Sequence, residues 1–107
     1  MTAFDIRTLL DQHRDAGRAY LEFLRVPALS MGIYKVPPGG VDPQGPHAED
    51  EVYYVLEGSG RFTVGAEERV VEAGQLLFVP ARVPHRFHDA TKDLVLLVFF
   101  APAESSP

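Results

Sequence analysis

The 107-residue sequence contains no cysteine, and this absence restricts both its covalent chemistry and its metal chemistry. Disulfide bridges, zinc sites built from thiolates and cysteine nucleophiles are all excluded. Any metal ion that this protein binds must therefore be held by imidazole nitrogens and by oxygen atoms.

Basic residues and long apolar runs are also scarce. The 10 Lys and Arg are outnumbered by 15 Asp and Glu, which gives a formal net charge of -5. An acidic chain of this kind is a poor binder of nucleic acid or of an anionic membrane surface. The apolar run at residues 94–101 is far too short to span a bilayer, and the N-terminus lacks the basic and apolar regions of a signal peptide. We therefore expect a cytoplasmic protein that binds neither nucleic acid nor membrane.

The length predicts one domain over residues 1–107, beginning with a short helix over residues 5–16. Apolar residues recur at helical spacing in that segment, Asp5 or Thr2 is available as an N-cap, and Gly17 marks the end. We interpret the helix as a lid or plug over an apolar opening, with His13 at its solvent edge. At the other end, residues 101–107 are expected to form a polar tail that frays.

Between the helix and the tail, residues 19–100 alternate short strand-like runs with glycine and proline, which is typical of an all-β sandwich or barrel. We expect about eight short antiparallel strands, at residues 19–25, 29–36, 51–56, 61–64, 69–72, 75–79, 85–89 and 94–100. The last strand is apolar at both odd-numbered and even-numbered positions, so it should be buried on both faces. One face can meet the interior and the other a partner subunit, which suggests a homodimer.

The segment at residues 45–51 concentrates one imidazole and three carboxylates. Side chains alternate along a strand, so His47, Glu49, Glu51 and Tyr53 share a face if the strand is continuous through them. Buried carboxylates are costly unless a cation or hydrogen-bond donors compensate their charge. The segment is therefore either part of a metal site or a solvated acidic loop that leads into a strand.

A second histidine segment follows the proline-bounded loop at residues 80–84. On a strand that begins at His85, the side chains of His85 and Phe87 point to one face and that of His88 to the other. His85 and Phe87 are the candidates for the interior, and His88 is expected at the surface or in an interface. By itself, His85 is equally well explained as a hydrogen-bonded histidine at the start of a strand.

The two segments together resemble the cupin superfamily, in particular its small single-domain members. The first cupin motif, G-x5-H-x-H-x3,4-E-x6-G, is matched at its first glycine, second histidine, glutamate and final glycine by Gly39, His47, Glu51 and Gly58. The second motif, G-x5-P-x-G-x2-H-x3-N, is matched by Gly74, Pro80 and His85. The resemblance implies a jelly-roll β-barrel that is often homodimeric and holds a divalent metal.

The sequence departs from the two motifs at three positions. Gly45 replaces the first motif histidine, Arg82 the second glycine of the second motif, and Asp89 its final asparagine. The resemblance thus implies a ligand set of His47, Glu51 and His85, which suits non-haem Fe(II). Glu49 is the candidate fourth ligand, and Gln44, next to the vacant histidine position, is a weaker one.

The sequence therefore predicts a small metal-binding cupin that takes a divalent ion (Fe, Mn, Zn or Ni) and a small organic ligand. Tyr53, Phe87 and Gln44 are the candidate pocket residues. As an enzyme, the protein would be a metal-dependent oxygenase of a chelating substrate or an isomerase acting through an enediolate. The alternatives are a cupin that binds metal or ligand without turnover, and a barrel without metal.

Overall fold

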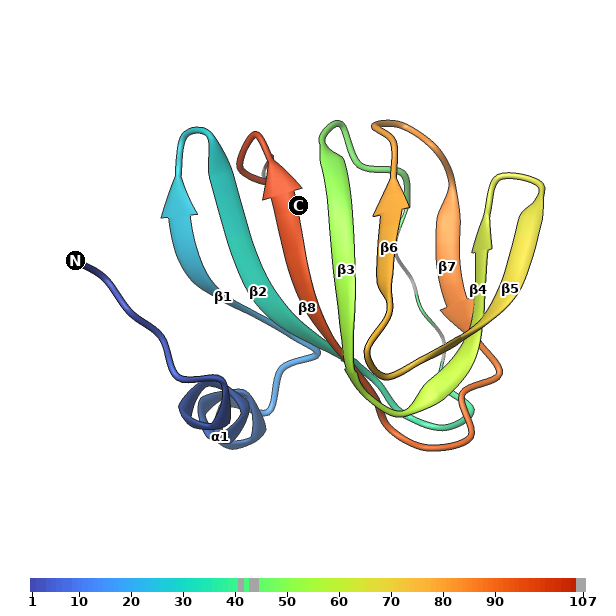
Figure 1. Ribbon diagram of the computed structural model, residues 1–107, viewed down its shortest axis with the longest axis horizontal. Coiled ribbons are helices and arrows are strands. Elements are labelled where there is room, and N and C mark those ends of the chain that lie inside the picture. The colour runs from blue at the N-terminus through green and yellow to red at the C-terminus, as the bar shows by residue number, and fades with distance from the viewer. Residues whose placement is uncertain (41, 43–44, 106–107) are drawn as a thin grey trace.

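A computed structural model describes residues 1–40, 42 and 45–105 (Figure 1). The predicted pocket residue Gln44 lies outside these residues. The expected helix and eight strands are all present, with boundaries close to those predicted. They are α1 (Ile6–Ala16), β1 (Tyr20–Val26), β2 (Leu29–Val36), β3 (Asp50–Glu57), β4 (Ser59–Val64), β5 (Glu67–Glu72), β6 (Leu76–Val79), β7 (His85–His88) and β8 (Leu94–Ala101). Within the described residues, no helix is long and apolar enough to cross a membrane.

The strands form two antiparallel sheets, as expected for a jelly roll. The larger sheet has the order β1-β2-β8-β3-β6 and the smaller one the order β5-β4-β7. Hydrogen bonding thus runs within two separate sheets and does not close around a barrel. Figure 1 shows the starts of β3 and β7 at the same end of the molecule, together with the end of β8. We refer to this end as the open end.

The core lies between the sheets and is built from alternate residues of each strand. On β3, Tyr53 and Val55 are buried while their neighbours are partly exposed. Aromatic rings dominate the centre: Phe62 of β4 and Phe87 of β7 stack with ring centroids 4.1 Å apart, and Tyr53 meets Phe87 edge-on at 4.9 Å. This rigid interior fixes the strands whose ends carry the candidate ligands.

Helix α1 covers the outer face of the larger sheet and does not plug an opening as predicted. Asp5 caps it by accepting a hydrogen bond from the Thr8 amide, and Gly17 ends it with a left-handed φ of 67°. Leu9 packs on the outward side chains Ile33, Val95 and Leu97 in a second apolar cluster. The helix is amphipathic, and the sheet face is the apolar surface within its reach.

Two further expectations change with this packing. His13 is 6% exposed and donates from Nε2 to the Ala19 carbonyl at 2.9 Å, so it is not at a solvent edge. The outward side chains Val95 and Leu97 of β8 pack with Leu9 of the chain's own helix, so their apolar character needs no partner subunit to explain it. The homodimer stays a prediction.

Of the tail predicted to fray at residues 101–107, Ala101 ends β8 and residues 102–105 are held against the open end, while residues 106–107 lie outside the described part of the chain. The Ala103 amide donates to the Pro27 carbonyl at 3.2 Å, and the Glu104 amide to Ser30 Oγ at 2.8 Å. Arg25 adds a 2.6 Å hydrogen bond to the carbonyl of Glu104. Polar composition suggested fraying, but here the backbone amides find acceptors on the turn between β1 and β2 and on β2 itself.

Candidate metal centre

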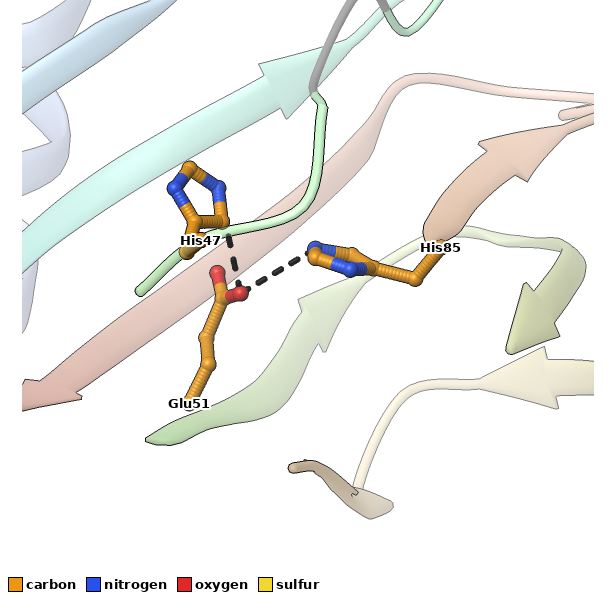
Figure 2. A group of neighbouring side chains, drawn as sticks. All are labelled: His47, Glu51 and His85. Atoms are coloured by element: carbon orange, nitrogen blue, oxygen red, sulfur yellow. Dashed lines mark ion pairs between the residues drawn. The ribbon is translucent and has the colours of Figure 1, made fainter. Parts of the chain in front are cut away.

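Three of the predicted ligands meet at the open end. His47 comes from the loop before β3, Glu51 is the second residue of β3, and His85 is the first residue of β7 (Figure 2). Each offers one ligand atom, and these atoms all lie within 4.8 Å of one another. Glu51 Oε1 is 3.1 Å from His85 Nε2 and 3.9 Å from His47 Nε2. The arrangement can hold a divalent ion between two imidazoles and one carboxylate.

Strand geometry positions Glu51 and His85. Glu51 lies on the inward face of β3, between its register partners Val79 of β6 and Phe100 of β8. His85 opens β7 directly after Pro84 and is in register with Val64 of β4. Since β3 belongs to the larger sheet and β7 to the smaller one, the site joins the two sheets.

The loop that carries His47 is fixed by contacts on both sides. The Arg82 amide donates to the His47 carbonyl at 2.6 Å, and the Ala81 amide donates to Asp50 Oδ1 at 2.9 Å. Upstream, buried Asp42 accepts hydrogen bonds from the Tyr34 hydroxyl at 2.7 Å and from the Phe87 amide at 2.8 Å. The loop is thereby tied to both sheets, and His47 is placed without being part of a strand.

Hydrogen bonding determines which nitrogen of His85 faces the site. Its Nδ1 lies 2.9 Å from the Val83 carbonyl oxygen, which can only accept, so Nδ1 carries a proton. Nε2 is left to face Glu51 and lies 3.1 Å from the Tyr53 hydroxyl oxygen. A backbone carbonyl on Nδ1 with Nε2 turned inward is the usual arrangement of a metal-ligating histidine.

The electrostatics of the pair favour a positive charge between Nε2 and the carboxylate. Burial by itself lowers the pKa of His85, but the close contact with Glu51, the hydrogen bond to Val83 and the charges of Glu51 and Asp42 outweigh it, and the pKa is raised. Glu51 is 1% exposed, and neither of its carboxylate oxygens accepts a hydrogen bond from the described residues. A proton on His85 or a metal ion can supply the missing charge.

The structure does not bring Glu49 into this group. Strand β3 begins at Asp50, so the alternation expected for residues 47–51 does not reach back to Glu49. Its Oε2 instead accepts a hydrogen bond of 3.2 Å from the Ser105 amide, and its Oε1 is buried without a hydrogen bond from the described residues. Glu49 therefore contacts the C-terminal segment.

The predicted pocket residues Tyr53 and Phe87 are inward-facing, as their strand positions indicate. Both are fully buried in the aromatic core, and Tyr53 reaches the site with its hydroxyl group. A surface pocket of about 240 Å³ approaches His85 from outside, with Pro46 and Pro84 among its lining residues. His88, as expected, points away from the site, and its ring contacts Thr63 and Asp89.

Two residues near the site were missed by the sequence reasoning. Glu104 Oε2 lies 3.6 Å from His47 Nδ1, and burial and the charge of Glu51 raise the pKa of Glu104. Tyr20 has a buried hydroxyl group without a hydrogen bond from the described residues, and burial followed by the charge of Glu104 raises its pKa. A Cβ at Gly32 would collide with the Tyr20 ring, so Gly32 leaves the space that this ring fills. No motif marks either residue.

Comparison with known proteins agrees with this fold. The sequence pattern of the Cupin_2 family, a cupin domain, matches residues 32–100. An uncharacterized protein of Streptomyces coelicolor is 44% identical over 105 residues, which cover 98% of this chain and 100% of that protein. A crystal structure of the protein TT1209 from Thermus thermophilus is 26% identical, covers 96% of this chain and 99% of that one, and superposes with a TM-score of 0.74.

A more distant similarity connects the chain to an enzyme. An acireductone dioxygenase of Sulfurihydrogenibium sp. is 41% identical over 63 residues, which cover 53% of this chain and 35% of the dioxygenase. The match thus spans about a third of that enzyme's length.

Proposed function

The chain belongs to the cupin domain family, and on that basis we propose that it binds one divalent metal ion through His47, Glu51 and His85. The observation that carries the proposal is the buried Glu51 carboxylate, which accepts no hydrogen bond from the described residues and faces the Nε2 atoms of both histidines. A buried carboxylate without donors costs several kcal/mol in the folded state. A cation bound between the three side chains removes that cost.

The ligand set favours a first-row transition metal. Two imidazoles and one carboxylate on one side of an ion are typical of non-haem Fe(II) sites and also suit Mn, Zn and Ni. When bound, such an ion supplies a Lewis acid or an oxygen-activating centre with free coordination positions. The protein's own part is to hold Nε2 of each histidine toward Glu51 and to surround them with the apolar core.

For the reaction itself, we propose metal-dependent oxygenation of a small chelating organic molecule. The partial match to an acireductone dioxygenase supports oxygen chemistry over isomerisation through an enediolate. The surface pocket beside His85 is the candidate position for the organic molecule. A cupin that binds metal and ligand without turnover is the alternative, and the test below separates it from an enzyme.

The metal proposal is tested by elemental analysis of the untagged protein after loading with Fe(II), Mn(II), Zn(II) or Ni(II). We expect about one equivalent in the wild type and a loss of at least tenfold in affinity in His47→Ala, His85→Ala and Glu51→Gln. His88→Ala is the matched control, because His88 lies on the same strand as His85 but faces outward. Equal metal content in all five proteins, or none in the wild type, would refute the proposal.

Oxygen uptake by the metal-loaded protein then tests whether the protein is an oxygenase. A panel of enediols, diketones and thiols should contain a substrate whose oxygen consumption requires the metal and fails in Glu51→Gln. Ligand-induced changes in the metal's spectrum with no oxygen consumption across the panel would favour the non-catalytic binder.

A further inference from the structure

The C-terminal segment carries an acidic side chain into the candidate metal centre. Residues 103–105 donate three backbone hydrogen bonds, to the Pro27 carbonyl, Ser30 Oγ and Glu49 Oε2. Arg25 bonds the carbonyl of Glu104. Four tethers on consecutive residues give this short segment one defined path, so the position of the Glu104 side chain is set by the fold.

The Glu104 carboxylate lies on the side of His47 that is turned away from Glu51. Its Oε2 is 3.6 Å from His47 Nδ1, whereas His47 Nε2 faces Glu51 Oε1 at 3.9 Å. The His47 ring is further packed edge-on against Phe100, with centroids 4.9 Å apart. The imidazole therefore has an acidic partner on each nitrogen and an aromatic ring against its side.

His85 shows the same division of roles between its two nitrogens. There the Val83 carbonyl holds Nδ1 and Nε2 faces Glu51. Both imidazoles thus have the shared carboxylate before Nε2 and an oxygen near Nδ1, which is hydrogen-bonded at His85 and in ion-pair contact at His47. Such an acceptor fixes the ring orientation and the tautomer of a metal-ligating histidine and increases its basicity.

We propose that Glu104 is the positioning residue of the metal centre, holding His47 in the Nδ1-protonated form with Nε2 directed at the ion. The proposal rests on the proposed function and extends it, because it makes the C-terminal segment part of the centre. Where the family motif has a first histidine, this chain has Gly45. The His47 ligand therefore carries more of the binding, and its orientation matters correspondingly more.

The first test is metal affinity of the full chain, measured by competition with a chelator. We expect Glu104→Ala to weaken Zn(II) binding about tenfold to hundredfold, and Glu104→Gln, which keeps an acceptor oxygen but no charge, to fall between it and the wild type. Glu22→Gln is the matched control, since it removes a nearby charge, retains an acceptor for Arg25 and does not contact His47. Unchanged affinity in Glu104→Ala would overturn the proposal.

The second test needs no metal. In 15N NMR spectra of the metal-free protein at about pH 9, above the ordinary titration range of imidazole, we expect the Nδ1-protonated tautomer in the wild type and in Glu22→Gln, and a shift toward the Nε2-protonated tautomer in Glu104→Ala. An unchanged tautomer in Glu104→Ala would refute the orienting role. If the wild type binds no metal, the proposed function fails, and the tautomer alone decides whether Glu104 orients His47.

Discussion

The amide of Arg82 donates a 2.6 Å hydrogen bond to the carbonyl oxygen of His47, so the two segments that carry the candidate ligands are joined through their backbones. To make this contact, Arg82 adopts a left-handed φ of 67°. Arg82 stands where the second cupin motif has a glycine, the residue that adopts this conformation without steric cost. In this chain a residue with a Cβ occupies that position in the left-handed conformation.

We therefore expect Arg82→Gly to stabilise the protein. Relief of the left-handed strain contributes about 1 kcal/mol, which for a domain of this size raises Tm by several degrees. Arg82→Ala is the control, because it removes the same exposed side chain but keeps a Cβ at positive φ. In thermal unfolding, the Tm of Arg82→Gly should be higher than the Tm values of the wild type and of Arg82→Ala. An alanine variant as stable as the glycine variant would assign the effect to the side chain.

Replacing Glu51 should stabilise the metal-free protein while abolishing metal binding. Glu51→Gln removes a buried charge whose oxygens accept no hydrogen bond from the described residues, and we expect a gain of about 1–3 kcal/mol. Urea unfolding in the presence of a chelator measures it at high pH, where His85 has released the proton that otherwise compensates the Glu51 charge. Glu57→Gln, at the exposed end of the same strand, should change stability by less than about 0.5 kcal/mol. A loss of stability in Glu51→Gln under these conditions would contradict the idea that the Glu51 carboxylate lowers the stability of the metal-free fold.

Stability of the metal-free protein should fall as the pH rises above 6.5. The pKa of His85 is raised from its ordinary value of 6.5, so folded protein retains its proton in a range where the unfolded chain has released it. The stabilisation from His85 is complete below pH 6.5 and disappears as the pH passes the folded-state pKa. Unfolding free energies measured between about pH 6 and pH 9 give the decrease of stability with pH, and His85→Gln should make this decrease smaller. Bound metal competes with that proton, so metal affinity should instead increase with pH.

Restoring the missing motif histidine should strengthen the metal centre. A Cβ built at Gly45 meets no atom within 4 Å, so a side chain there has space. We expect Gly45→His to add an imidazole ligand and to tighten Zn(II) or Ni(II) binding by at least about tenfold, whereas Gly45→Ala should match the wild type. Chelator competition distinguishes them. Equal affinities in the two variants would show that residue 45 points away from the ion.

The sequence predicted the elements of the fold closely because their signals are local. Alternating apolar residues, glycine and proline at the turns, and Asp5 and Gly17 at the helix ends depend on near neighbours in the chain. The convergence of His47, Glu51 and His85 was predictable from the spacing of the motifs. Glu51 and His85 lie on strands that the local pattern predicts, and His47 lies in the loop just before one of them.

The expectations that changed depend on contacts between distant segments. The apolar stripe of α1 does not say which surface it covers, and in the structure it packs on Val95 and Leu97 instead of an opening. Glu104 lies 57 positions after its partner His47 in a segment of small and polar residues, which looks like a fraying tail until its hydrogen-bond acceptors are known. Glu49 shows the reverse error, because β3 begins at Asp50 and the alternation expected from residue 47 onward does not include it.

Asp42 has a consequence for how loops of this protein can vary. Because its carboxylate is shared between the Tyr34 hydroxyl of β2 and the Phe87 amide of β7, the chain is anchored five positions before His47. Residues inserted between Val36 and Asp42 leave the span from anchor to ligand unchanged, whereas residues inserted after Asp42 lengthen it. Among natural relatives, length variation should therefore collect on the upstream side of this aspartate, and the downstream span should keep a constant number of residues.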